Sequence, residues 1–90
     1  MTNKKKYKKK YHDFYIQRRF IYEIFLHYWK YRDYKAVERA ISSNITVDDF
    51  IDENIKKIYK WILDRYRAGK SISIIKAHLE LKNEVGDLRK

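Results

Sequence analysis

Large apolar side chains recur between residues 11 and 31 at the spacing of one helical face: Phe14, Ile21, Ile24, Phe25 and Tyr28. Others extend the apolar surface around the same predicted helix: Phe20, Tyr22, Leu26 and Trp29. Tyr, Phe and Ile also favour strands, but the length of the pattern and the absence of turn residues indicate a helix. A helix that is apolar nearly all round is either central to a bundle or partly covered by another molecule.

A shorter helix is predicted over residues 33–43, with an apolar pattern formed by Tyr34, Val37, Ala40 and Ile41. Asp33 is a suitable N-cap for this helix. The alternative is that Asp33 and Tyr34 continue the first helix, because no strong helix breaker separates the two segments. Residues 42–44, Ser-Ser-Asn, are typical of a loop.

The stretch 45–81 contains two further helices with recognisable starts and one clear stop. Thr46 and Asp49 have the spacing of a capping box, so we expect Val47, Phe50 and Ile51 to form one buried turn. Acidic residues at 52 and 53 then suit the positive end of a helix dipole. The apolar stripe of this helix is Ile55, Ile58, Tyr59, Ile62, Leu63 and Tyr66. Trp61 falls toward the polar side, which predicts an exposed rim residue or interface anchor.

Gly69 is the expected end of that helix, with Arg65 and Arg67 in its last turn. Ser73 is the predicted cap of a final helix. The apolar residues of this helix are Ile74, Ile75, Ala77, His78, Leu79 and Leu81, if the histidine is counted among them. Residues 83–90 are expected to fray. The pattern predicts an all-α protein with one helical domain over residues 11–90.

Charge is distributed unevenly along these 90 residues, whose formal net charge is +10. Six of the positive charges lie in the first ten residues: Lys4, Lys5, Lys6, Lys8, Lys9 and Lys10. Since like charges repel and nothing in this segment can be buried, we predict that residues 1–10 form a disordered basic tail. No apolar run is long enough to span a bilayer and no secretory signal is evident, so the expected location is the cytoplasm.

The sequence offers no catalytic constellation, cofactor motif or metal site, and the chain is not predicted to be an enzyme. Cysteine is absent, and His12, His27 and His78 are scattered rather than clustered at ligand spacing. Gly69-Lys70-Ser71 lacks the upstream glycine of a phosphate-binding loop. The acidic residues between 48 and 53 are best explained as helix caps.

The stretch 45–81 resembles the helical domain shared by the N-terminus of DnaB-type replicative helicases and the C-terminus of DnaG-type bacterial primases. The matching residues are Ile45-Thr46, Asp49-Phe50, Ile58-Tyr59, Ile62, Tyr66, Gly69, Ile72 and Leu79. The segment Arg18–Ile21 departs from the opening of the helicase version, and the lysine-rich start slightly favours the primase branch. The resemblance implies an orthogonal bundle of about five to six short helices, without catalytic activity, that contacts a helicase or primase.

We therefore expect a protein-interaction module of the DNA replication machinery, whose partner is a replicative helicase or primase, in a helicase–primase or helicase-loader type of contact. Trp and Tyr dominate binding hot spots, and arginines would line the rim. The candidate partner-binding residues are Tyr22, Trp29, Tyr31, Trp61 and Arg65. The alternative is a small nucleic-acid-binding protein that uses the six tail lysines together with Arg18 and Arg19. The sequence leaves the oligomeric state open.

Overall fold

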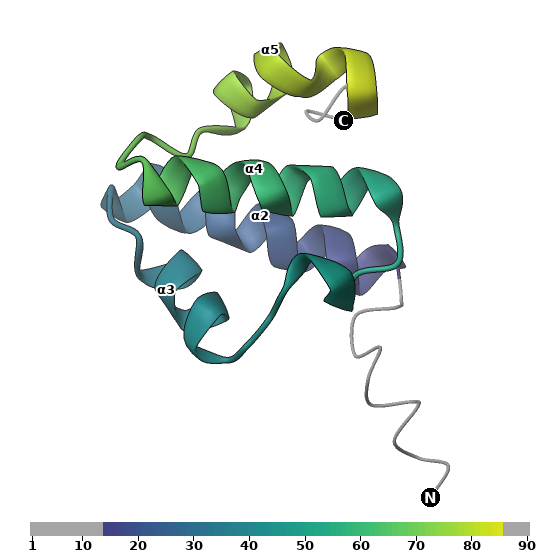
Figure 1. Cartoon of the computed structure of the whole chain (residues 1–90). Helices are drawn as coiled ribbons and strands as arrows, with labels where there is room; N and C mark the ends of the chain where they lie inside the picture. The colour runs from purple at the N-terminus through teal and green to yellow at the C-terminus, as the bar shows by residue number, and fades with distance from the viewer. Residues whose placement is uncertain (1–13, 86–90) are drawn as a thin grey trace, which may run out of the picture.

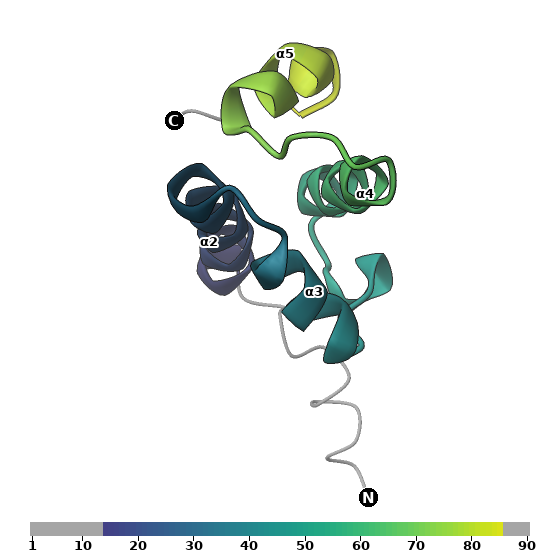
Figure 2. The same ribbon diagram turned by 90° about the vertical axis from the view of Figure 1, so that its left-hand side faces the viewer.

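A computed structural model describes residues 14–85 of the chain, and this part is all-α. It contains helices α2 (Phe14–Tyr31), α3 (Lys35–Ser42), α4 (Glu53–Arg67) and α5 (Ile74–Val85), with a 3₁₀ turn η1 (Val47–Asp49). Helices α2 and α4 lie side by side and run in the same direction, α3 and η1 lie below them, and α5 runs back above α4 (Figures 1 and 2). Helix α4 contacts every other element.

The all-α prediction is confirmed, and the part of the chain that the structure describes has fewer helices than were predicted for the whole. Within residues 14–85 there are four α-helices and one 3₁₀ turn, rather than five or six helices. The predicted tail at residues 1–10, the predicted domain start at residue 11 and the last five residues of the predicted frayed end lie outside this range.

Three of the helices, α2, α3 and α4, are each followed within two residues by a residue in the left-handed region. Gly69 has a φ of 69°, as predicted for a glycine stop, while Arg32 and Asn44 have φ values of 56° and 61°. The backbone N–H of Arg32 still donates to the carbonyl of Tyr28, so Arg32 closes α2 and separates it from α3. A left-handed arginine is uncommon because its Cβ crowds the backbone. The two helices are thus separate, as predicted, although the left-handed residue between them is not one that the sequence marks as a helix stop.

Polar side chains begin the helices largely as predicted. The Asp52 carboxylate accepts hydrogen bonds from the backbone N–H groups of Asn54 and Ile55, at 2.8 and 3.1 Å, and caps α4. The Thr46 backbone N–H donates to Asp49 Oδ2 at 2.6 Å, within the predicted capping box. The Ser73 Oγ accepts from the N–H of Lys76 at the start of α5.

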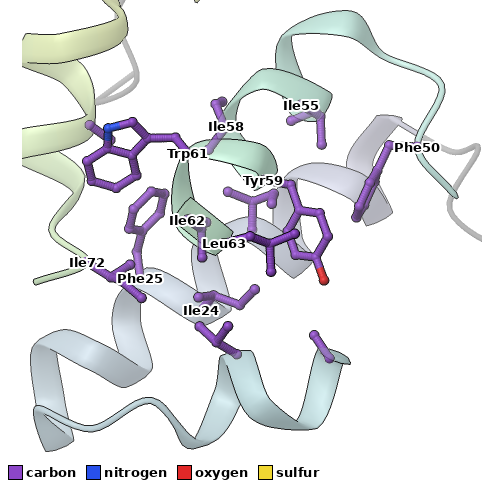
Figure 3. Packing of buried hydrophobic residues seen from close by; sticks show 14 of the residues in the cluster. Ile24, Phe25, Phe50, Ile55, Ile58, Tyr59, Trp61, Ile62, Leu63 and Ile72 are labelled. Carbon is purple, nitrogen blue, oxygen red and sulfur yellow. The ribbon is translucent and has the colours of Figure 1, made fainter. Parts of the chain in front are cut away.

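The core is centred on α4, where Tyr59 and Ile62 have no exposed surface (Figure 3). Helix α2 contributes Ile21, Ile24 and Phe25 to it, and residues beyond α4 contribute Ile72, Ala77 and Leu81. The rings of Phe20, Phe50 and Tyr59 pack together with centroids 5.2 to 6.0 Å apart. Ile51, which was expected in the buried turn, is 49% exposed. Of the other residues expected in this turn, Phe50 is fully buried and Val47 is half-buried. Ile51 differs from Phe50 because neighbouring side chains in extended backbone point in opposite directions.

Gln17 is the one buried polar side chain among the described residues, with an exposed fraction of 1%. Its Oε1 accepts hydrogen bonds from the backbone N–H groups of Ile51 and Asp52, at 3.3 and 3.2 Å. Those two groups lie between η1 and α4, where no helix supplies them with a backbone acceptor. Gln17 therefore attaches the start of α4 to α2.

The variant Gln17→Leu keeps the side-chain size but leaves both backbone N–H groups without their acceptor. Each unsatisfied group costs about 1 kcal/mol or more, so we expect the free energy of unfolding to fall by about 2 kcal/mol in urea denaturation. Lys30→Leu, at an exposed position of the same helix, is the control and should change it by less than about 0.5 kcal/mol. Equal effects of the two variants would contradict this role of Gln17.

Candidate functional site

An open groove of about 1160 Å³ is lined by residues of α2 and of the segment that begins α5. Figure 2 shows how these two helices are placed in the bundle. The lining of the groove is mostly aromatic and aliphatic, including Tyr15, Tyr22, Leu26, Trp29, Ile74 and Ile75. Leu26, Trp29 and Ile75 are 59%, 69% and 60% exposed. Large apolar side chains gathered at this exposure are typical of a binding surface, whereas single ones are common everywhere.

The apolar groove is flanked by arginines. Arg18 and Arg19 line it near the beginning of α2, and Arg32 lines it just beyond the end of that helix. Glu23 is the acidic residue of the lining, and its carboxylate lies 3.0 Å from Arg19 Nε. The hydrogen bond that Arg19 donates to the Glu23 carboxylate, followed by the electrostatic interaction with Tyr15, raises the pKa of Arg19. The groove therefore carries excess positive charge.

Of the predicted partner-binding residues, Tyr22, Trp29 and Tyr31 lie on α2, and the first two line the groove. Tyr22 is half-buried, with the Arg18 guanidinium 5.7 Å from its ring centroid. Tyr31 is 57% exposed, at the end of the helix, and its ring packs against His27 with centroids 4.7 Å apart. Arg18 and Arg19, which were predicted for nucleic acid, line the same groove. The six tail lysines lie outside the described range.

The prediction that Trp61 is exposed is wrong, because α5 covers it. Trp61 is 8% exposed, its ring packs 6.4 Å from Phe25, and Figure 3 shows it reaching toward α5. The indole Nε1 donates to Glu80 Oε1 at 2.7 Å. The helical phase of α4 did identify a second face, but the final helix, rather than another protein, packs on it.

Arg65 belongs to the same contact between α4 and α5. Its guanidinium lies 5.0 Å from the centroid of Trp61 and 3.6 Å from Glu80, and its Nε donates to the carbonyl of Ser71. The Arg65 side chain is 14% exposed. These contacts give Arg65 and Trp61 an evident structural role, attaching α5 and the segment that precedes it to α4.

The groove includes residues that sequence reasoning did not single out as site residues. The sequence pattern indicates only general apolar surface at Leu26 and Ile75, and it does not mark Arg32. The available signal was that α2 is apolar on more sides than one neighbour can bury. The contribution of α5 to the groove could not be inferred, because it depends on how two distant segments pack.

No group of three His, Cys, Asp or Glu side chains that could hold a metal ion exists within residues 14–85. His27 Nε2 lies 2.6 Å from Asp33 Oδ1, whereas the Glu23 carboxylate contacts Arg19. His27 and Glu23, which are four residues apart on α2, therefore contact different residues. A smaller pocket of about 360 Å³ near His27 is lined by Phe20, Arg39 and Ile45 among others. None of the helices described is long and apolar enough to cross a membrane.

Comparisons with known proteins found no protein-family model, curated protein or solved structure that matches this chain. The resemblance of residues 45–81 to the helicase and primase domain therefore stays a prediction.

The variant Glu80→Ala tests the contact between α4 and α5. It removes the acceptor of the Trp61 indole and the ion-pair partner of Arg65, so we expect the free energy of unfolding to fall by about 1–2 kcal/mol. In a Trp29→Phe background, emission reports Trp61 alone and should shift to longer wavelength as α5 loosens. Glu53→Ala, which removes an exposed ion pair with Lys56 and a carboxylate from the first turn of α4, is the control. It should lower the free energy of unfolding by less than about 1 kcal/mol and leave the emission unchanged. An unshifted emission in Glu80→Ala would contradict the proposed attachment.

Asp33 gives a prediction for acid conditions at the corner between α2 and α3. The backbone N–H of Lys35, and after it His27, lower the pKa of Asp33 below its ordinary value of 3.8. A lowered pKa means that the charged carboxylate stabilises the fold above 3.8 and that this stabilisation is lost as the pH falls through the folded-state value. When the free energy of unfolding is measured at decreasing pH, it should therefore decrease less in Asp33→Asn than in the wild type. Lys35→Ala keeps the backbone N–H, so it is the control and should show the same decrease as the wild type. Identical pH curves for the wild type and Asp33→Asn would contradict this assignment.

Proposed function

We propose that this chain is a non-catalytic protein-interaction module that binds a partner protein in the groove between α2 and α5. The observation that carries the proposal is the uncovered apolar stripe of α2, where Leu26 and Trp29 are 59% and 69% exposed. Trp and Tyr side chains of this kind supply most of the binding energy at many protein interfaces. The burial of Trp61 leaves α2 as the main aromatic surface of the described residues.

The partner in this proposal is a component of the DNA replication machinery, a replicative helicase or primase, in the cytoplasm. This part rests on the resemblance of residues 45–81. The resembling residues include Tyr59, Ile62 and Gly69, which are core and helix-end residues. These residues therefore support a similarity of fold, whereas the groove lies mainly on α2, outside residues 45–81.

The second candidate function is nucleic-acid binding, which the net charge of +10 favours. The six tail lysines supply most of that charge, and Arg18 and Arg19 extend it onto α2. Arg19 is engaged by Glu23, so the described surface alone is a weaker phosphate site than its arginine content suggests. In this function the tail, rather than the groove, carries most of the affinity.

A pull-down with the purified full chain, in the presence of nuclease, tests the proposed function. The wild type should recover a helicase or primase, identified by mass spectrometry, and Leu26→Asp should reduce recovery at least tenfold because a charge enters the apolar stripe. Leu79→Asp is a matched control, since Leu79 is 60% exposed on α5 but does not line the groove. Equal loss in both variants, or no dependence on Leu26, would contradict binding in the groove. Recovery that disappears with nuclease in the wild type would favour the second candidate.

A further inference from the structure

We infer that the groove accepts one α-helix of a partner protein, about three turns long, with apolar residues on one face and acidic residues at both ends. This inference rests on the proposed function and specifies its ligand. It follows from the spacing of the lining residues along α2, the aliphatic wall from α5 and the position of the arginines.

The length follows from α2. Arg18, Tyr22, Leu26 and Trp29 all line the groove at steps of three or four residues, so they lie along one face of the helix. Residues 18 and 29 are about 16 Å apart at a rise of 1.5 Å per residue, which corresponds to three helical turns. A groove bounded by two helices fits the apolar face of a third helix, in which every third or fourth side chain inserts between them.

The charge follows from the ends of the groove. Arg18 and Arg19 lie at one end, and Arg32 lies near the other, about 21 Å away along the helix axis. Arg32 makes no ion pair with any residue in the range 14–85. At the first end Glu23 offsets one of the two arginine charges, so this end keeps a net charge of +1 and the other end carries the charge of Arg32. Acidic residues near both ends of the ligand helix therefore match the groove.

Two other occupants fit less well. A second copy of this chain would bring together two molecules of net charge +10, which repel each other. Single-stranded nucleic acid would use Tyr22 and Trp29 as stacking surfaces, but it gains little from aliphatic walls such as Leu26 and Ile75. Apolar residues on a helix bury those walls and the aromatic rings together.

The experiment uses three labelled 16-residue helical peptides with the same leucine and phenylalanine face and with Glu, Gln or Lys at both ends. Each is titrated with the full chain by fluorescence anisotropy at low and at moderate salt. The Glu peptide should bind at least tenfold more tightly than the Lys peptide, with a smaller difference at higher salt. Arg32→Gln should weaken the Glu peptide about threefold or more and leave the Gln peptide unchanged. Arg67→Gln is the control, because Arg67 lies at the exposed end of α4, away from the groove.

The results separate failure of the inference from failure of the proposed function. If all three peptides bind equally and Leu26→Asp abolishes this binding, the ligand does not need acidic ends, and the groove is still a protein-binding site. No peptide binding, alongside a pull-down that still depends on Leu26, overturns the helical ligand alone. Failure of both experiments overturns both proposals. Self-association in sedimentation, or binding of a 16-nucleotide single strand, overturns the inference when Leu26→Asp abolishes it but Leu79→Asp does not.

Discussion

The arrangement depends on the need to bury α4 on two sides. One face carries Tyr59 and Ile62, which are fully buried against α2 and its neighbours, and another carries Trp61. A helix with apolar residues on both sides can be stable only when each side is covered. Helix α5 therefore crosses above α4, and the Trp61 indole finds its acceptor in Glu80. Every other described element contacts α4, which makes it the centre of the fold.

This constraint determines which apolar surface is left exposed. The sequence offered two roles for the apolar helix α2: the centre of the bundle, or a helix partly covered by another molecule. Since α4 occupies the centre, α2 packs through Ile21, Ile24 and Phe25 and leaves Leu26 and Trp29 in solvent. The exposed side of α2 is thus a consequence of how the small number of helices is distributed around α4.

Local signals predicted much of the secondary structure, and long-range packing produced the errors. The end of α4 at Gly69, the cap at Asp52 and the all-α class follow from short-range chemistry. The burial of Trp61 depends on a helix that begins more than ten residues later, which periodicity within α4 cannot reveal. The separation of the helices at residues 14–31 and 35–42 agrees with the prediction of two segments, although no glycine or proline marks the left-handed residue, Arg32, between them. The groove could not be predicted in the same way, since it depends on how α5 lies relative to α2.

The left-handed backbone at Arg32 places stability and binding in opposition at one position. A non-glycine residue at a φ of 56° costs about 1 kcal/mol relative to glycine, so glycine would be the better helix end there. That replacement would remove the guanidinium that lines one end of the groove. A selection for thermal stability alone should therefore replace the arginine, whereas a selection for binding should retain it. In the proposed function, the cost of this helix end is offset by the guanidinium that it supplies to the groove.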